Sequence, residues 1–208
     1  MTPGKFITLE GGEGVGKTTN LDFIVSRLRD RGLEVVATRE PGGTVFGEAV
    51  REIFLHHAEV RPEAELLLLF AARVHHLREV VEPALQRGAW VVCDRFTDAS
   101  YAYQGAGRGI DRSVIDFLRD WIQAGLRPDL TLLLDAPVDT GLTRARQRSG
   151  PDRLEREDIA FFARVREGYL ALAQAEPGRI RVIDAARPLA VVQAAIASQL
   201  DLLLSGRV

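Results

Sequence analysis

The sequence predicts an α/β fold, in which five parallel strands form one sheet with helices on both of its faces. The main observation is an alternation of short apolar runs with longer stretches of helical periodicity. Near-continuous apolar runs that end on polar residues are typical of strands buried in a parallel sheet. The runs lie at 5–10, 34–40, 89–96, 130–136 and 179–185. A second observation is the glycine-rich stretch "GGEGVGKT" directly after the first run. The alternation implies right-handed βαβ units, with ligands at the carboxyl ends of the strands.

The helical stretches have recognisable starts and stops. Residues 17–32 are apolar at 21, 24, 25 and 28 and end at Gly32, a common helix stop. The stretch 61–88 starts near Pro62, stops at Gly88 and is expected to bend at Pro83. It is apolar almost all round, so much of it should be buried in the domain or in a subunit contact. Further helices are predicted over 112–125, from about 138, over 156–178 and over 188–204.

Length and charge exclude several classes of protein. The 208 residues suit one domain and are too few for two of ordinary size, so we expect a single domain over 1–208. The formal net charge of −2 gives no basic field of the kind that nucleic-acid binders use. No stretch approaches the roughly 20 apolar residues of a membrane span, and the first residues do not form a signal peptide. We therefore expect a cytoplasmic protein without a nucleic-acid or membrane partner.

Cysteine and histidine usage does not predict a metal site. The single cysteine, Cys93, excludes an internal disulfide and is expected to be a small buried strand residue. The four histidines form two adjacent pairs, at 56–57 and 75–76. Neighbours on a helix point about 100° apart and cannot easily hold one ion.

The stretch "GGEGVGKT" fits the phosphate-binding pattern G-x-x-x-x-G-K-[ST] at every fixed position, and it lies between a strand and a helix. In such a P-loop, backbone N–H groups and the positive end of the helix face the phosphates, a lysine adds charge, and a hydroxyl can bind Mg²⁺. We therefore expect a nucleoside triphosphate with Mg²⁺. The expected binding residues are Gly11, Gly12, Glu13, Gly14, Val15, Gly16, Lys17, Thr18 and Thr19, together with Arg144 farther along the chain.

The remaining polar strand ends favour a small kinase. The chain has no guanine-reading "NKxD" stretch, and motor ATPases are usually larger. A kinase needs a second anion site, and Arg39 and Arg95 follow two strands at the edge where the P-loop lies. Asp94 is placed like the carboxylate that holds Mg²⁺, directly or through water. The alternative is that these arginines form a structural network with Glu40 or Asp94.

Six further motifs follow the P-loop: "REPGGT" (39–44), "FAARVHH" (70–76), "DRF" (94–96), "SYAYQGAGRG" (100–109), "RPDLTLLLD" (127–135) and "RARQRSGPDRLE" (144–155). In their combination and spacing they are similar to the bacterial thymidylate kinase family over essentially the whole chain. The resemblance implies a P-loop NTPase fold with strand order 2-3-1-4-5. It also implies a homodimer that transfers the γ-phosphate of ATP to thymidine monophosphate (dTMP), with Mg²⁺ as cofactor.

The resemblance assigns roles to residues of the acceptor site. Phe70 matches the ring that stacks on thymine, although core packing alone would also explain it, and Arg73 matches the donor to a thymine carbonyl. Tyr103 matches the tyrosine that crowds the sugar 2′ position. In the same way, Glu13 is expected to point to the sugar end of the acceptor and Arg95 to hold its phosphate. The full expected acceptor set is Glu13, Arg39, Pro41, Phe70, Arg73, Arg95, Ser100, Tyr103 and Gln104.

The segment 144–155 is predicted to be a lid rich in arginine. Ser149, Gly150 and Pro151 interrupt a helical pattern there, so a loop could bring positive charge to a transferring phosphate. The resembled bacterial subgroup supplies its catalytic arginine from this lid, and the P-loop of this chain carries no basic residue before Lys17. Arg148 is the first choice, Arg153 the second and Arg144 the third. The alternative is a solvated charged face, since nearby acidic residues nearly balance the charge.

Two other functions remain open from the residues themselves. One is a kinase for another nucleoside or nucleotide, and the other is a non-catalytic nucleotide-dependent switch. A switch would bind a triphosphate without a second-substrate pocket. The adenine contacts are weakly encoded, and the segment 185–187 after the last strand is expected to lie beside the base.

Overall fold

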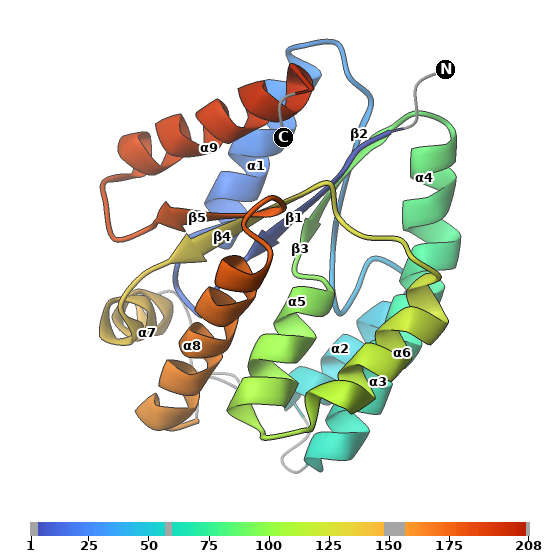
Figure 1. Cartoon of the computed structure of the whole chain (residues 1–208), viewed down its shortest axis with the longest axis vertical. Helices are drawn as coiled ribbons and strands as arrows, with labels where there is room; N and C mark the ends of the chain where they lie inside the picture. The colour runs from blue at the N-terminus through green and yellow to red at the C-terminus, as the bar shows by residue number, and fades with distance from the viewer. Residues whose placement is uncertain (1–3, 57–59, 148–156, 207–208) are drawn as a thin grey trace.

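The computed structural model describes residues 4–56, 60–147 and 157–206, and its central element is a parallel sheet of five strands. The strands are β1 (Phe6–Glu10), β2 (Val35–Arg39), β3 (Trp90–Asp94), β4 (Leu130–Asp135) and β5 (Ile180–Asp184). Their order is β2-β3-β1-β4-β5, with every neighbouring pair parallel (Figure 1). The predicted strands and the predicted order are therefore confirmed.

Successive side chains of a strand point to opposite faces of the sheet, and helices cover both faces. On one side, Ile7 and Leu9 pack in a core cluster with helices α1 (Lys17–Arg29) and α9 (Leu189–Leu204). On the other side, Phe6 and Val91 pack with α3 (Pro62–His76) and α6 (Arg112–Gln123). Figure 1 shows α1 and α9 together on one side of the sheet and α3, α6 and α8 (Ile159–Ala175) on the other. Cys93 is buried in β3, as predicted.

Several helix boundaries follow from local chemistry. Asp111 caps α6 by accepting a hydrogen bond from the backbone N–H of Ser113 at 2.7 Å, and Asp158 caps α8 in the same way with Phe161 at 2.6 Å. The predicted helix after residue 137 is α7 (Val138–Arg146). The long stretch from Pro62 consists of α3, a π-helical segment (Leu77–Val81) and α4 (Glu82–Gln86). The π turns come directly before Pro83, which has no N–H to donate to the preceding turn.

Two helical segments were not predicted from the sequence. Helix α2 (Val45–His56) follows the paired glycines of "REPGGT", and α5 (Thr97–Ser100) continues into a second π-helical segment (Tyr101–Gly107). Glycines inside a segment suggest a loop, which hides the helical pattern. Here Gly107 has a packing reason, because a Cβ at this position would lie 2.7 Å from the ring of Phe161 on α8.

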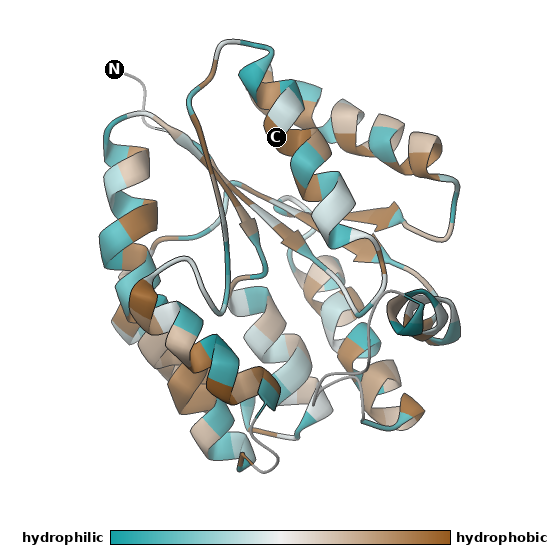
Figure 2. Cartoon of the chain, turned by 180° about the vertical axis from the view of Figure 1, so that it is seen from behind, coloured by the Kyte–Doolittle hydropathy of each residue, from teal (hydrophilic) through white to brown (hydrophobic). Residues whose placement is uncertain are grey.

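The hydropathy of the chain follows this layered arrangement. In Figure 2 the strands are mostly apolar, and the helices around them carry both apolar and polar segments, as expected for helices with one buried face. Within the described residues, no helix has the length and apolar character needed to cross a membrane.

Candidate active site

The P-loop connects β1 to α1 at the carboxyl edge of the sheet. Gly14 and Gly16 have φ angles of 67° and 90°, which residues other than glycine rarely adopt. The ammonium of Lys17 donates hydrogen bonds to the carbonyls of Gly12 at 2.8 Å and Gly11 at 3.3 Å, so it lies across the loop. Thr18 and Thr19 are exposed at the start of α1. The loop therefore presents a charged group, a hydroxyl and a helix N-terminus to one region, which suits phosphate.

Helix α7 packs against the P-loop without space for a side chain between them. A Cβ on Gly14 would lie 1.8 Å from the carbonyl oxygen of Gly141, and a Cβ on Gly141 would lie 2.4 Å from the carbonyl oxygen of Glu13. Both glycines are thus required by close backbone approach. Farther along α7, Arg144 donates to the carbonyl of Ala185 at 2.9 Å. The structure therefore places Arg144 beside the start of the segment expected to border adenine.

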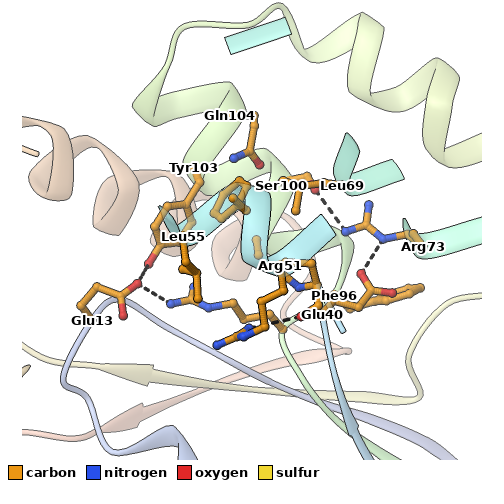
Figure 3. A pocket seen from close by; sticks show the side chains of 14 residues that line it. Glu13, Glu40, Arg51, Leu55, Leu69, Arg73, Phe96, Ser100, Tyr103 and Gln104 are labelled. Atoms are coloured by element: carbon orange, nitrogen blue, oxygen red, sulfur yellow. Dashed lines mark hydrogen bonds and ion pairs between the residues drawn. The ribbon is translucent and has the colours of Figure 1, made fainter. Parts of the chain in front are cut away.

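A cavity opens beside the P-loop, between the sheet edge and helices α2, α3 and α5. It combines charged groups with apolar walls, as is common for small-molecule sites. Figure 3 shows Glu13 and Tyr103 at one end, and Arg73 with Glu40 at the other. We call it the acceptor cavity. Its lining residues are Glu13, Glu40, Pro41, Arg51, Phe54, Leu55, Leu69, Arg73, Arg95, Phe96, Ala99, Ser100, Tyr103 and Gln104.

Arg95 forms the end of the acceptor cavity nearest the P-loop. Its guanidinium donates to the carboxylate of Glu13 at 2.6 Å and to the carbonyl of Gly11 at 3.1 Å. The hydroxyl of Tyr103 donates to the same Glu13 oxygen at 2.7 Å. Arg95 also has a φ of 68°, a strained value for a residue with a side chain, and such strain is concentrated at functional sites. The carboxylate of Glu13 thus faces the cavity and orients the arginine there.

Arg73 forms the opposite end and is held by a buried ion-pair cluster. It donates to Glu40 at 2.7 Å and to the hydroxyl of Ser100 at 3.2 Å. His76 contacts the other Glu40 oxygen at 2.8 Å. Burial would raise the pKa of Glu40, but the charge of Arg73 and the contact with His76 outweigh it, so the pKa lies below its usual range. The cluster therefore fixes the position of a cation that is only 2% exposed.

Two buried polar atoms of the acceptor cavity have no hydrogen-bond partner among the described residues. They are Nη1 of Arg73 and Oε1 of Gln104. The first can only donate and the second can only accept. Buried polar groups are nearly always paired, so these two atoms indicate a missing ligand that offers one acceptor and one donor.

Comparison with known proteins decides the family of this chain. Residues 9–196 match the family model described as thymidylate kinase. The chain belongs to the thymidylate kinase family. The thymidylate kinase of Methylococcus capsulatus is 86% identical over 208 residues, covering 100% of both chains. The thymidylate kinase of Chromohalobacter salexigens is 59% identical, covering 96% of each chain. A solved structure of thymidylate kinase from Ehrlichia chaffeensis matches with a TM-score of 0.80 and 34% identity, covering 95% of this chain and 100% of that one.

In this member of the thymidylate kinase family, two expected acceptor residues lie outside the acceptor cavity. Phe70 is 1% exposed and packs in the core beneath the Arg73 guanidinium, whose carbon lies 4.4 Å from the ring centroid. Leu69, four residues before Arg73 on the same helix, is among the lining residues. Arg39 points away and pairs with Glu48 on α2 at 2.8 Å, with 51% of its side chain exposed.

The other expected site residues are distributed as follows. Glu13, Pro41, Arg73, Arg95, Ser100, Tyr103 and Gln104 line the acceptor cavity. Asp94 ends β3 at the same edge, and its Oδ1 is buried without a partner in the described part of the chain. Arg148 and Arg153 lie outside the described residues.

The sequence reasoning missed Arg51, Leu69 and Glu65. Arg51 lines the acceptor cavity from α2, and it could not be placed because α2 itself was not predicted. Leu69 could have been found from its spacing of four residues to Arg73. Glu65 is fully buried one turn before Leu69 and accepts a hydrogen bond from Gln104 at 2.8 Å. A glutamate inside an apolar helix stretch is the only sequence signal for it.

Proposed function

We propose that the acceptor cavity binds dTMP and the P-loop binds ATP, so that the two phosphates meet between Arg95 and Lys17. Family membership assigns the reaction: the chain phosphorylates dTMP to dTDP with ATP as the donor. The acceptor is already a phosphate oxyanion, so the reaction needs little help from a general base. Catalysis rests instead on positioning and on charge that stabilises the transferring phosphoryl group. A switch without a second-substrate site is therefore excluded.

The observation that carries the site assignment is the pair of unsatisfied atoms. Thymine offers an O4 acceptor next to an N3–H donor. Nη1 of Arg73 needs an acceptor and Oε1 of Gln104 needs a donor. The two atoms complement this edge of thymine, whereas cytosine reverses both groups. We propose that Leu69 and Phe96 form the apolar walls beside the ring.

The opposite end of the acceptor cavity suits the sugar and phosphate of dTMP. We propose that Arg95 and Arg51 hold the acceptor phosphate, and that Glu13 keeps Arg95 in place. Tyr103 lies against Glu13 at 2.7 Å and is proposed to crowd the sugar 2′ position, which favours deoxyribose. Pro41 and Ser100 complete the lining.

The donor side is proposed to contain Mg²⁺, held by the hydroxyl of Thr18 and by Asp94, directly or through water. The fit is supported by the buried Asp94 Oδ1 without a partner in the described residues, since carboxylate and hydroxyl oxygens are the ligands that Mg²⁺ prefers. When bound, the ion neutralises charge on the β- and γ-phosphates. Lys17 adds a second positive charge at the same phosphates.

Positive charge on the transferring phosphoryl group is proposed to come from the segment 144–155. Arg148 remains the first choice for this role, then Arg153, and Arg144 is proposed to lie beside the adenine of ATP. Arginines in such a position contribute on the order of 10³ to 10⁵ in rate. Replacing Arg148 with alanine should therefore lower kcat strongly with little change in nucleotide binding, as measured by turnover and by ATP titration.

We also propose that the chain acts as one domain over 1–208 and assembles as a homodimer in the cytoplasm. The dimer is supported by exposed apolar side chains on the neighbouring helices α3 and α6. On α6, Phe117 is 66% and Trp121 71% exposed, and their rings stack at 6.2 Å. On α3, Leu67 is 58% exposed. Exposed apolar groups of this size mark contact surfaces.

A panel of nucleoside monophosphates tests the proposal. ADP release is coupled to a spectroscopic assay with dTMP, dUMP, dCMP and dAMP as acceptors. We expect the highest kcat/KM with dTMP, a lower value with dUMP by roughly tenfold because one methyl contact is lost, and almost no turnover with dCMP or dAMP. Equal turnover of dCMP and dTMP would contradict the base-reading role of Arg73 and Gln104.

A further inference from the structure

Glu65 is a buried carboxylate beside the acceptor cavity that no step of the reaction uses. It lies on α3 and is fully buried. Its Oε1 accepts a hydrogen bond from Nε2 of Gln104 at 2.8 Å. The guanidinium of Arg108 lies 3.5 Å from the same oxygen and supplies a positive charge beside it. Arg108 is in turn paired with Glu157 at 2.7 Å.

A carboxylate next to an amide determines which way the amide faces. The oxygen and the NH₂ group of a glutamine side chain have nearly the same shape, so an isolated glutamine can rotate to suit either a donor or an acceptor. Oε1 of Glu65 accepts the hydrogen bond from Nε2, so the NH₂ group of Gln104 faces Glu65. The amide oxygen is then left for the cavity, where Gln104 is a lining residue and Oε1 has no partner. Figure 3 shows the amide end of Gln104 directed toward Ser100 and Tyr103.

We propose that Glu65 is a specificity-determining residue, which locks the amide of Gln104 so that the cavity accepts a pyrimidine with an N3–H and rejects one with an N3 lone pair. This inference rests on the proposed binding of the base against Gln104. Thymine and uracil carry the N3–H, and cytosine carries the lone pair. To accept cytosine, the Gln104 amide would have to turn its oxygen toward the Glu65 carboxylate. Two acceptors would then face each other in a buried site, which is costly.

The two reading groups of the cavity are fixed by the same device. Arg73 is held by Glu40 at 2.7 Å and presents a donor to position 4 of the ring. Gln104 is held by Glu65 at 2.8 Å and presents an acceptor to position 3. Each buried glutamate accepts a hydrogen bond from its partner, and neither needs to touch the base. Because Arg73 is held by Glu40, its discrimination against cytosine does not depend on Glu65.

The test compares dTMP with 5-methyl-dCMP, which has the same methyl group, sugar and phosphate and differs only at positions 3 and 4 of the ring. The variant is Glu65→Gln, because an amide at this position can accept from Gln104 or donate to it. Both orientations of Gln104 then become available. We expect kcat/KM for 5-methyl-dCMP to rise about tenfold and kcat/KM for dTMP to fall by no more than about threefold. A merely structural role for Glu65 would lower both values.

Two controls accompany this variant. Glu63→Gln removes an exposed carboxylate from the first turn of the same helix and should change neither value by more than about twofold. In a Gln104→Ala background, Glu65→Gln should no longer raise the value for 5-methyl-dCMP, because the residue it acts through is absent. If Glu65→Gln does not fold, Glu65→Ala takes its place in the test. Water at the vacated site can accept or donate, so kcat/KM for 5-methyl-dCMP should again rise.

Two outcomes overturn the inference and can be told apart. If 5-methyl-dCMP turnover is unchanged in the folded Glu65 variants, or rises equally without Gln104, Glu65 does not set the orientation of the amide. If Gln104→Ala alone leaves the preference for dTMP over 5-methyl-dCMP intact, the base does not lie against Gln104, and the proposed acceptor site fails together with this inference.

Discussion

At the scale of single residues, the site depends on charged groups that are oriented before any ligand arrives. Arg95 and Glu13 each have 17% of the side chain exposed, and their closest atoms lie 2.6 Å apart. An arginine held in this way loses little freedom when it binds phosphate. The unusual carboxylate in the P-loop thus serves the acceptor side, where it orients a cation.

This arrangement predicts the effect of Glu13→Gln. The amide keeps the shape of the side chain but loses the charge that holds Arg95, so kcat/KM for dTMP should fall by about ten- to a hundredfold. The KM for ATP should stay within about twofold, because the loop binds phosphate through its backbone. Steady-state kinetics at varied dTMP and varied ATP measure both values. Glu52→Gln, an exposed change on α2 paired only loosely with His56 at 3.5 Å, is the control. An unchanged kcat/KM for dTMP would show that Glu13 does not position Arg95 for the acceptor.

Glu10 predicts a pH dependence of stability. Burial, and then the charge of Asp98, raise the pKa of Glu10 from 4.5 to about 8. The folded protein therefore retains a proton that the unfolded chain releases above about pH 4.5. Stability from this group is fully present below that pH and is lost as the pH rises through about 8.

Urea unfolding at pH 6 and pH 8 checks this expectation. The free energy of unfolding of the wild type should fall between the two pH values by more than that of Glu10→Gln, which cannot ionise. The free energy of unfolding of Glu10→Gln, relative to that of the wild type, should therefore be higher at pH 8 than at pH 6. An equal pH dependence in both proteins would show that Glu10 does not titrate in this range.

At the scale of elements, the contact between α7 and the P-loop connects a helix to nucleotide binding. Gly141→Ala would place a Cβ 2.4 Å from the carbonyl of Glu13 and so push the helix away from the loop. We expect the KM for ATP to rise about tenfold and the free energy of unfolding to fall by about 1 to 3 kcal/mol. Thr143→Ala, an exposed change on the same helix, should leave both nearly unchanged. ATP titration and urea unfolding measure the two effects. An unchanged KM for ATP in Gly141→Ala would show that the contact between α7 and the P-loop does not affect ATP binding.

The elements also show how far the sequence alone could lead. The five strands were predictable, because buried parallel strands leave a continuous apolar signal, whereas their order was implied by the family resemblance. Helix α2 was not predictable, because the glycines before it suggest a loop, and Arg51 was missed with it. Phe70 was assigned to the base by resemblance; the structure buries its ring beneath the Arg73 guanidinium, and Leu69 lines the cavity beside it. Residues three and four positions before Arg73 both lie near its face of the helix, so a motif match alone does not decide which of them lines the cavity.

At the scale of the whole molecule, the proposed dimer depends on the apolar surface of α3 and α6. Burying a tryptophan that is 71% exposed in the single chain would contribute roughly 2 kcal/mol per subunit. We expect light scattering to give about twice the 22.9 kDa of one chain. Trp121→Glu should return the mass to that of one chain at micromolar concentration. Leu189→Glu, at an apolar position on α9 that is 50% exposed, is the control and should leave the dimer intact. A wild-type protein with the mass of one chain would contradict the proposed assembly.

The account as a whole depends on the acceptor cavity being the dTMP site, and a crystal structure of the protein with dTMP and ADP tests this most directly. We expect the thymine ring against Leu69, its O4 within hydrogen-bond distance of Arg73 Nη1, and its N3 within the same distance of Gln104 Oε1. The dTMP phosphate should contact Arg95. Density for dTMP elsewhere, or a bound base that leaves both of these atoms without a partner, would contradict the account.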